Sequence, residues 1–207
     1  MIETTQLFYF LIASAALTIL PGPDILFVTV QSISRGKWAG ISTALGLCTG
    51  LIVHTTAAAI GISAIIYNSA VAFTIVKYLG ALYLLYLAVT VLCDKSALVS
   101  ESVVKLDKMA LYKKGIFMNL LNPKISLFFL AFLPQFVNLN SGSVSIQMII
   151  LGLVFMLQAI LIFSAVAVFS SFFGEKILKS QKFGKYINIA KAGIFGVIGI
   201  QLALSTK

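Results

Sequence analysis

Two apolar stretches of this chain are each interrupted by proline next to a charged residue, and these interruptions limit the folds open to it. The first, Leu-Pro-Gly-Pro-Asp at 20–24, lies inside an apolar run at about 7–30. The second, Asn-Pro-Lys at 122–124, lies inside a run at about 115–137. Proline removes a backbone donor and clashes with the preceding turn, so we expect each run to form a broken helix.

The hydrophobicity of the chain places these helices in a lipid bilayer. Of the 207 residues, 60% are hydrophobic and only 10% are charged, which is too little polar surface for a soluble domain. A membrane-spanning helix needs about 20 apolar residues. Six runs meet that length, at about 7–32, 40–66, 70–92, 114–137, 146–172 and 188–204. We therefore predict an all-α integral membrane protein with a single membrane domain, residues 1–207.

The basic residues predict how the helices are oriented. Twelve of the fifteen Lys and Arg lie in the connections after the first, third and fifth runs or in the first few residues of the run that follows, whereas 67–69 and 138–145 contain none. Cytoplasmic loops carry the excess of Lys and Arg, so both termini are expected on the outer side of the membrane. A net charge of +9 could also indicate nucleic-acid binding, but no basic cluster with aromatic residues or known motif is present, so we expect no nucleic-acid partner.

This topology divides the chain into two inverted halves. Residues 1–93 and 114–207 each contain three predicted spans, joined by a cytoplasmic linker at 94–113. Because each half has an odd number of spans, the second is inverted relative to the first, and each break falls in the first helix of its half. We expect two inverted three-helix repeats, an architecture in which paired interruptions indicate a transporter binding site. The linker could also form a short amphipathic helix.

Two charges are predicted near the middle of the membrane. Asp24 and Lys124 each follow a proline, and a charge at this depth costs about 2.5–3.5 kcal/mol on insertion scales. One interpretation is a structural ion pair that ties the two halves together. The other is that Asp24 carries a proton or binds the ammonium of a substrate, and the two interpretations are compatible.

Each break is also expected to begin a new half-helix. Gly22 and Asn122 suit the N-cap position, followed by Pro23 and Pro123 at the first helical position. The free N–H groups and the positive dipole end of such a half-helix bind a carboxylate. With Asp24 nearby, the site could hold both ends of a zwitterion. The alternative is that the prolines, Pro21 included, only kink the helices for packing.

Three other polar residues, predicted at similar depth, complete the candidate substrate- and proton-binding site. His54 is either a proton relay with Asp24 or a partner in an interhelical hydrogen bond. Asn119 either lines the cavity or satisfies the broken backbone, and Gln158 is expected to join helices by packing. Small residues at helical spacing predict close-packing faces, in the stripes Gly36, Gly40, Ala44 and Cys48; Gly46 and Gly50; and Gly193, Gly196 and Gly199.

The two motifs, together with Arg35-Gly36, the stretch 46–54 and the segment 117–136, resemble the LysE/RhtB family of amino acid exporters over nearly the full chain. The resemblance implies a multi-pass protein of the bacterial inner membrane that exports amino acids or derivatives, such as homoserine, threonine, lysine or leucine, by proton antiport. It also implies a central site built from the two motifs. These residues are Pro21, Gly22, Pro23, Asp24, Asn122, Pro123 and Lys124.

Other classes of membrane protein fit this sequence less well than a transporter. A transmembrane thiol-redox carrier needs reactive cysteines at the breaks, and Cys48 and Cys93 lie outside both motifs. A non-transporting assembly subunit explains the hydrophobicity but not the charges within the membrane. A metal-ion exporter is disfavoured by the scarcity of His, Cys and Asp at this depth. We expect no enzymatic activity and no cofactor; a homo-oligomer is compatible with the sequence.

Overall fold

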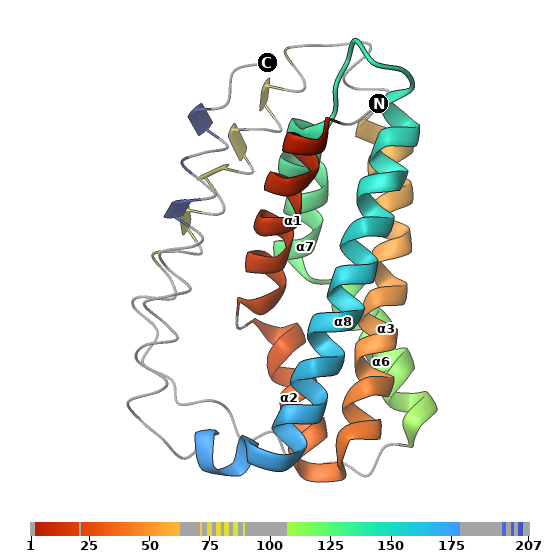
Figure 1. Ribbon diagram of the computed structural model, residues 1–207, viewed down its shortest axis with the longest axis vertical. Helices are drawn as coiled ribbons and strands as arrows, with labels where there is room; N and C mark the ends of the chain where they lie inside the picture. Colours follow the sequence, from red (N-terminus) through yellow and green to blue (C-terminus); the bar gives the residue numbers. More distant parts are fainter. Residues whose placement is uncertain are drawn as a thin grey trace.

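The structure, a computed structural model, describes residues 3–20, 22–62 and 107–178, together with isolated residues between 71 and 89 and between 196 and 204 (Figure 1). Every regular element in this described part is a helix, which confirms the all-helical prediction there. The third and sixth predicted spans fall largely outside the described residues. The count of six spans and their inverted arrangement therefore remain predictions.

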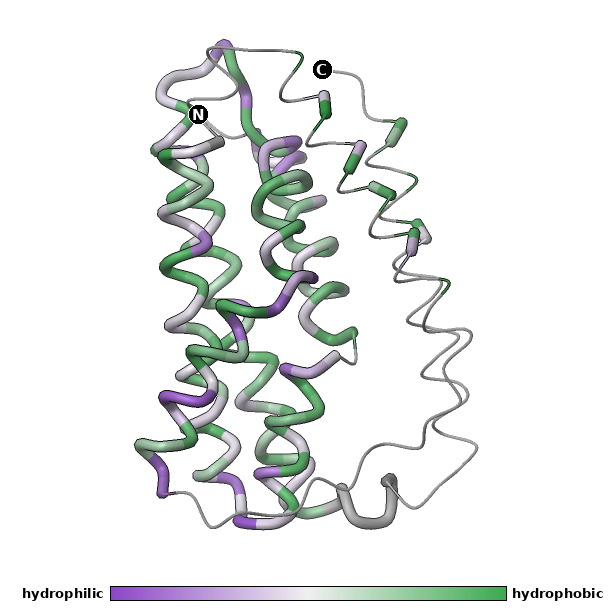
Figure 2. Tube along the Cα trace, turned by 180° about the vertical axis from the view of Figure 1, so that it is seen from behind, coloured by the Kyte–Doolittle hydropathy of each residue, from purple (hydrophilic) through white to green (hydrophobic). Residues whose placement is uncertain are grey.

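Two long helices are apolar enough to cross a membrane. The first is α3 (Lys37–Ala57), which continues into a π-helical turn, η1 (Ala58–Ile62), and the second is α8 (Val144–Leu178). Large apolar side chains on these helices, such as Ile52 and Leu161, are exposed on the surface of the protein. Figure 2 shows apolar residues along most of the length of the bundle. Such a surface is expected where helices face lipid.

The other two candidate spans are broken helices, as predicted. Helices α1 (Thr4–Ile19) and α2 (Pro23–Arg35) meet at an angle of 56°. Helix α6 (Lys108–Leu120) and the segment that begins with α7 (Pro123–Leu127) meet at 49°. Both breaks lie about midway along the bundle (Figure 1).

The local sequence explains where each new helix starts. Pro23 and Pro123 occupy the first turns of α2 and α7, and Gly22 and Asn122 occupy the N-cap positions in extended conformation. Proline at this position costs the helix no hydrogen bond, because a backbone N–H in the first turn would have no partner within the helix. The predicted N-caps are therefore confirmed.

The start of the second broken helix corrects the sequence-based boundary. Helix α6 begins at Lys108, six residues before the predicted start of the fourth span, so the end of the predicted linker is helical. Asp107 caps it, since its side chain accepts a hydrogen bond of 2.6 Å from the backbone N–H of Ala110. The predicted linker residues before Asp107 lie outside the described part.

Beyond its break the second helix changes form twice. Helix α7 continues into a π-helical segment, η2 (Phe128–Phe132), and then into a 3₁₀ helix, η3 (Leu133–Phe136). The segment η2 contributes to a cluster of buried aromatic rings whose centroids lie 5.1–6.1 Å apart. We call it the phenylalanine cluster; its members are Phe10, Phe128, Phe129, Phe132, Phe136 and Phe155.

Glycine permits the close packing around α3, which contacts α2, α6 and α8. A methyl group on Gly46 would overlap the backbone of Tyr112 in α6, and one on Gly40 would overlap the side chain of Ser32 in α2. At Gly36 the backbone has φ of 83°, which favours glycine and lets α2 turn directly into α3. The predicted packing faces are thus confirmed at Gly40 and Gly46.

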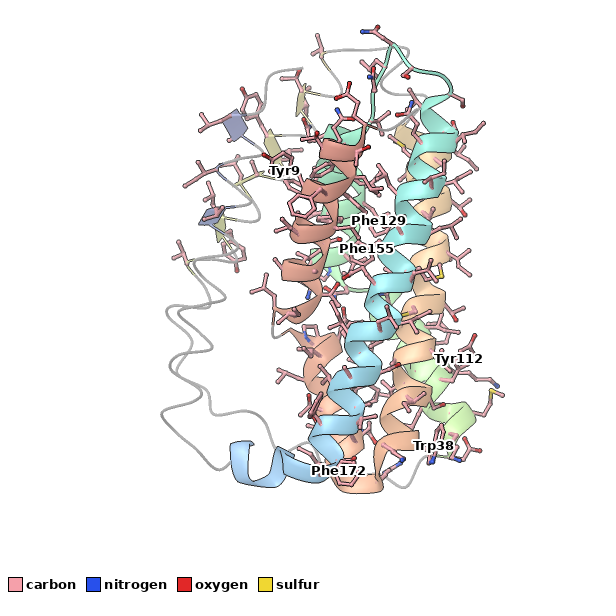
Figure 3. All side chains as sticks on the ribbon, viewed as in Figure 1. Tyr9, Trp38, Tyr112, Phe129, Phe155 and Phe172 are labelled. Atoms are coloured by element: carbon pink, nitrogen blue, oxygen red, sulfur yellow. The ribbon has the colours of Figure 1, made fainter. Side chains whose placement is uncertain are left out.

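Basic residues collect at one end of the bundle. Arg35 and Lys37 lie where α2 meets α3, and Lys108, Lys113 and Lys114 lie in the first turns of α6 at the same end, which Figure 2 shows as hydrophilic. Trp38 also lies at this end, with Nζ of Lys37 5.7 Å from the centroid of its ring (Figure 3). Aromatic residues beside basic ones are typical of a membrane–water interface. The side of the membrane that this end faces remains a prediction.

Candidate functional site

The two breaks meet inside the bundle. The side-chain amide of Asn122, at the second break, donates a hydrogen bond of 2.6 Å to Oδ2 of Asp24, just after the first break. The exposed fraction is only 1% for Asp24 and 3% for Asn122. The polar residues singled out in the two motifs are therefore neighbours, and they are closed off from solvent.

Lys124 stabilises the broken end of α1. Its ammonium donates hydrogen bonds to the carbonyl oxygens of Leu17, at 3.1 Å, and Leu20, at 3.5 Å. The last carbonyl groups of a helix have no partner within it, and they form the negative end of its dipole. A lysine from the second break thus caps a helix in the first half of the chain.

Asp24 and Lys124 also attract each other electrostatically. Lys124 is only 4% exposed, so both charges are removed from water and depend on their protein partners. Gly22 allows the ammonium to come close, because a Cβ atom there would lie 3.3 Å from Nζ of Lys124. The resulting centre contains one anion, one cation and one amide, contributed by both breaks.

The starts of α2 and α7 differ, and the prediction that each start offers free N–H groups to a ligand is wrong for α7. At the second break Oδ1 of Asn122 accepts a hydrogen bond of 3.0 Å from the N–H of Lys124, and the carbonyl of Asn122 accepts from Ile125. The start of α7 is therefore already satisfied and offers no free N–H for a ligand. At the first break Gly22 has no side chain to cap α2.

One oxygen of the central carboxylate lacks a donor. Oδ1 of Asp24 is buried and has no hydrogen-bond partner among the described residues, whereas Oδ2 is held by Asn122. Leaving a buried charged acceptor unsatisfied is costly. Oδ1 of Asp24 is thus the atom in this centre best suited to receive an ammonium or a proton.

His54 approaches the same centre from α3. Its Nε2 donates a hydrogen bond of 3.1 Å to the carbonyl of Asn119 in the last turn of α6. The ring of His54 also packs against Phe129, with centroids 5.8 Å apart, and the side chain interacts electrostatically with Asp24. The interhelical hydrogen bond expected from sequence is therefore present, and a relay of protons to Asp24 remains a prediction.

The side chain of Asn119 does not complete the cap at the second break. It packs against Gly50 of α3, where an added Cβ would lie 2.7 Å from Oδ1 of Asn119. The backbone of Asn119, by contrast, accepts from the N–H of Asn122 across the break. Gly50 is therefore a third packing glycine, and it positions the end of α6.

Gln158 joins α8 to α1 beside the first break. Its Nε2 donates a hydrogen bond of 2.8 Å to Oγ1 of Thr18, which in turn donates to the carbonyl of Ser14. This matches its predicted role in joining helices. Thr18 was not singled out from the sequence, although it is polar, lies in an apolar run and sits less than one turn before the motif.

Cys48 is also closer to the centre than its sequence position suggests. The sequence predicts only a place on a packing face for Cys48, yet its side chain is 2% exposed and interacts electrostatically with Asp24. Its place on α3, less than two turns before His54, was the signal available. Of the ten residues predicted for the site, Pro21 lies outside the described residues. The other nine lie at or around the two breaks: Gly22, Pro23, Asp24, His54, Asn119, Asn122, Pro123, Lys124 and Gln158.

Comparison with known proteins identifies the family. The model of the family described as LysE type translocator matches residues 15–206. The chain belongs to this family. LysE type translocators are transporters, so the protein is not an enzyme, and the resemblance seen in the two proline motifs is confirmed. No solved structure matches the chain.

Individual relatives agree with the family. The chain is 36% identical over 202 residues to the uncharacterized membrane protein YrhP of Bacillus subtilis, covering 93% of this translocator and 95% of the relative. It is 33% identical over 147 residues to proteins of Salmonella choleraesuis and Salmonella typhimurium that are named leucine efflux protein. These matches cover 69% of this chain and 68% of each relative.

Proposed function

We propose that this translocator exports amino acids or close derivatives from the bacterial cytoplasm by alternating access. The observation that carries the proposal is the buried centre in which Asn122 holds Asp24 and Lys124 caps α1. Membership of the LysE family and the names of the Salmonella relatives support an amino acid as the cargo. In the membrane, charged groups buried together in this way mark substrate or ion pathways.

The centre offers complementary groups for the two ends of an amino acid. The ammonium would bind Oδ1 of Asp24, the carboxylate oxygen that lacks a donor. The carboxylate would lie at the start of α2, where the positive dipole end has no side-chain cap, with the ammonium of Lys124 close to Gly22. Helix α2 rather than α7 is the relevant half-helix, because Asn122 caps the latter.

Transport requires that this closed centre open to each side in turn. We propose that two inverted repeats, residues 1–93 and 114–207, rock around the breaks, with six spans and both termini on the periplasmic side. The phenylalanine cluster, whose members Phe129 and Phe155 are labelled in Figure 3, would close the centre toward the end that carries the loop after Phe136. In a transport cycle, these rings would separate when the centre opens toward that end. The packed glycine faces would separate when the centre opens toward the basic end.

Proton coupling would act through Asp24. Protonation from the outside removes the charge that holds the substrate ammonium, so the substrate is released outward. Deprotonation toward the cytoplasm restores the site for the next molecule. His54 interacts electrostatically with Asp24 and is the candidate relay.

Flux measured with the purified full-length protein tests this proposal. Proteoliposomes loaded with single amino acids should release at least one of them when a pH gradient is imposed, and Asp24→Asn should remove the dependence on the gradient. A growth screen with toxic amino acids in a sensitive host would first narrow the choice. If no amino acid moved, the alternative of a non-transporting assembly subunit would gain support. If Asp24→Asn left pH-driven efflux unchanged, Asp24 would not be the coupling residue.

A further inference from the structure

A buried glutamine, Gln31, lies on α2 between the centre and the basic end of the bundle. Its side chain is only 6% exposed, and its amide oxygen Oε1 has no hydrogen-bond partner among the described residues. A structural glutamine differs from this one. In Gln147 both ends of the amide are bonded, to Asn138 and Ser141. A buried acceptor without a donor costs stability, so Gln31 calls for an explanation other than packing.

The position of Gln31 on α2 relates it to Asp24. Seven residues separate the two, which is close to two helical turns, so both side chains lie on one face of α2. Oδ1 of Asp24 and Oε1 of Gln31 are both buried acceptors without a partner in the described part of the chain. They are about 10 Å apart along the helix axis. Figure 1 shows α2 running from the first break to the end of the bundle where it meets α3. The two acceptors therefore mark a path from the centre toward the basic end.

A cation lies on the same face of α2 at the far end of this path. Arg35 follows Gln31 by about one turn, is half-buried, and is the last residue of α2. An acceptor and a guanidinium at this spacing complement the ammonium and the carboxylate of a zwitterion. One ammonium cannot contact Gln31 and Asp24 at the same time, because two turns of helix separate them. The two acceptors would therefore bind it in succession.

The helices beside Gln31 are those that must separate for the bundle to open toward the basic end. The next residue, Ser32, faces Gly40 of α3, and a Cβ atom on Gly40 would lie 2.9 Å from Cβ of Ala167 in α8. Helices α2, α3 and α8 therefore meet closely at this level. Their separation would let a solute from the basic end reach Gln31 before it reaches Asp24.

We propose that Gln31 forms a second binding site for the ammonium of the substrate, on the route from the cytoplasm to Asp24. Oε1 of Gln31 accepts a hydrogen bond from the ammonium while Arg35 attracts the carboxylate, and the ammonium then passes to Oδ1 of Asp24. A neutral acceptor binds an ammonium more weakly than a carboxylate does, so Gln31 does not retain the substrate. The inference rests on the proposed function and its orientation, and it adds a residue to the cytoplasmic side of the site.

Gln31→Met tests the inference, because it removes the acceptor and keeps the length of the side chain. Inside-out vesicles that contain the full-length protein present its cytoplasmic face to the medium, and right-side-out vesicles present the opposite face. The probe is radiolabelled leucine, the amino acid in the names of the Salmonella relatives. We expect KM at the cytoplasmic face to rise about tenfold, the effect of one lost hydrogen bond to a charged group, with kcat nearly unchanged. KM at the opposite face should not change.

Gln6→Met is the matched control. Oε1 of Gln6 is also buried and without a partner in the described part of the chain, but Gln6 lies in the first turn of α1, on the other side of the first break. The same substitution there should leave KM at the cytoplasmic face unchanged.

Thermal unfolding in detergent separates this role from a structural one. Removal of a buried acceptor that has no donor should leave the Tm of Gln31→Met unchanged or raise it. An unchanged KM at the cytoplasmic face, or a rise confined to the opposite face, would overturn the inference and leave amino acid export intact. If the native protein moved no amino acid in either kind of vesicle, the proposed function would fail as well.

Gln31→Cys provides a second measurement, for the case in which Gln31→Met does not fold. In a Cys48→Ser, Cys93→Ser background, an impermeant thiol reagent should label this position in inside-out vesicles during transport of leucine. The same reagent should not label it in right-side-out vesicles. Labelling only from the opposite face, or from neither face while leucine is transported, would place Gln31 off the cytoplasmic route.

Discussion

Lys124 lies in the second half of the chain and stabilises the end of a helix, α1, in the first half. Its ammonium donates to two carbonyls at the end of α1 and attracts Asp24, while its backbone N–H is held by Asn122. One side chain therefore satisfies a helix end and balances a buried carboxylate. Removal of the Lys124 ammonium therefore leaves the carbonyl groups of α1 and the carboxylate of Asp24 without a partner in a low-dielectric interior.

Lys124→Met should therefore destabilise the protein by about 3–5 kcal/mol, the cost of breaking a buried charge pair on one side. Thermal unfolding in detergent measures the change. Lys113→Met is the matched control, because Lys113 is exposed near the start of α6. Combining Lys124→Met with Asp24→Asn should cost less than the sum of the two single changes, since the second change removes the orphaned charge. Strict additivity would show that the two charges do not depend on each other.

Local sequence rules predict the parts of the candidate site but not how those parts pair. The prolines, the caps Gly22 and Asn122, and the charges Asp24 and Lys124 follow from local rules for helix ends and from the cost of charge in lipid. The same local rules do not predict which of these groups pair with one another. Whether Lys124 meets Asp24, the carbonyls of α1 or both depends on how two distant helices rotate against each other, and a single sequence does not encode that rotation in any local pattern.

At the scale of elements, glycine sets the distance between helices. Gly46 faces the backbone of Tyr112, and Gly50 faces the side chain of Asn119, so α3 and α6 touch along two successive turns. This contact holds the end of α6 in the position from which Asn119 receives the hydrogen bond of His54. The stripe of small residues was visible in the sequence, but its partner helix was not.

Gly46→Ala should push α3 and α6 apart and destabilise the protein by about 1–3 kcal/mol, the usual cost of overpacking. The obstructing atoms belong to the backbone of Tyr112, which cannot move aside as a flexible side chain could. Gly61→Ala is the control, since nothing lies within 4 Å of a Cβ atom at that position. It should be neutral or slightly stabilising in the same unfolding measurement.

At the scale of the whole molecule, the candidate site is sealed and must open for transport. Cys48 is 2% exposed and interacts electrostatically with Asp24, so its thiol reports on that opening. In a Cys93→Ser background, a thiol reagent should label Cys48 slowly at rest and at least several-fold faster during transport of a substrate. The fraction labelled with time, read by mass spectrometry, measures this. Labelling that is fast and independent of substrate would mean that the centre is already open.

The orientation predicted from the basic residues can be checked with two exposed positions. In a Cys48→Ser, Cys93→Ser background, Asn140→Cys should react with a membrane-impermeant thiol reagent added outside the cell. Lys113→Cys should react only after permeabilisation, since it lies at the basic end. The reverse pattern would place both termini in the cytoplasm. Labelling is again read from the intact protein by mass spectrometry.

The exchange of partners between the breaks has a consequence for biogenesis. When the first 93 residues have left the ribosome, Lys124 and Asn122 have not yet been synthesised. The carbonyl groups at the end of α1 then lack the ammonium that caps them, and Asp24 lacks the amide that donates to it. The inserted first half should therefore be incompletely stabilised, and quality-control proteases should degrade it unless residues 122–124 are inserted beside it. Two genes that divide the chain between residues 94 and 106 should give stable protein only when they are expressed in the same cell.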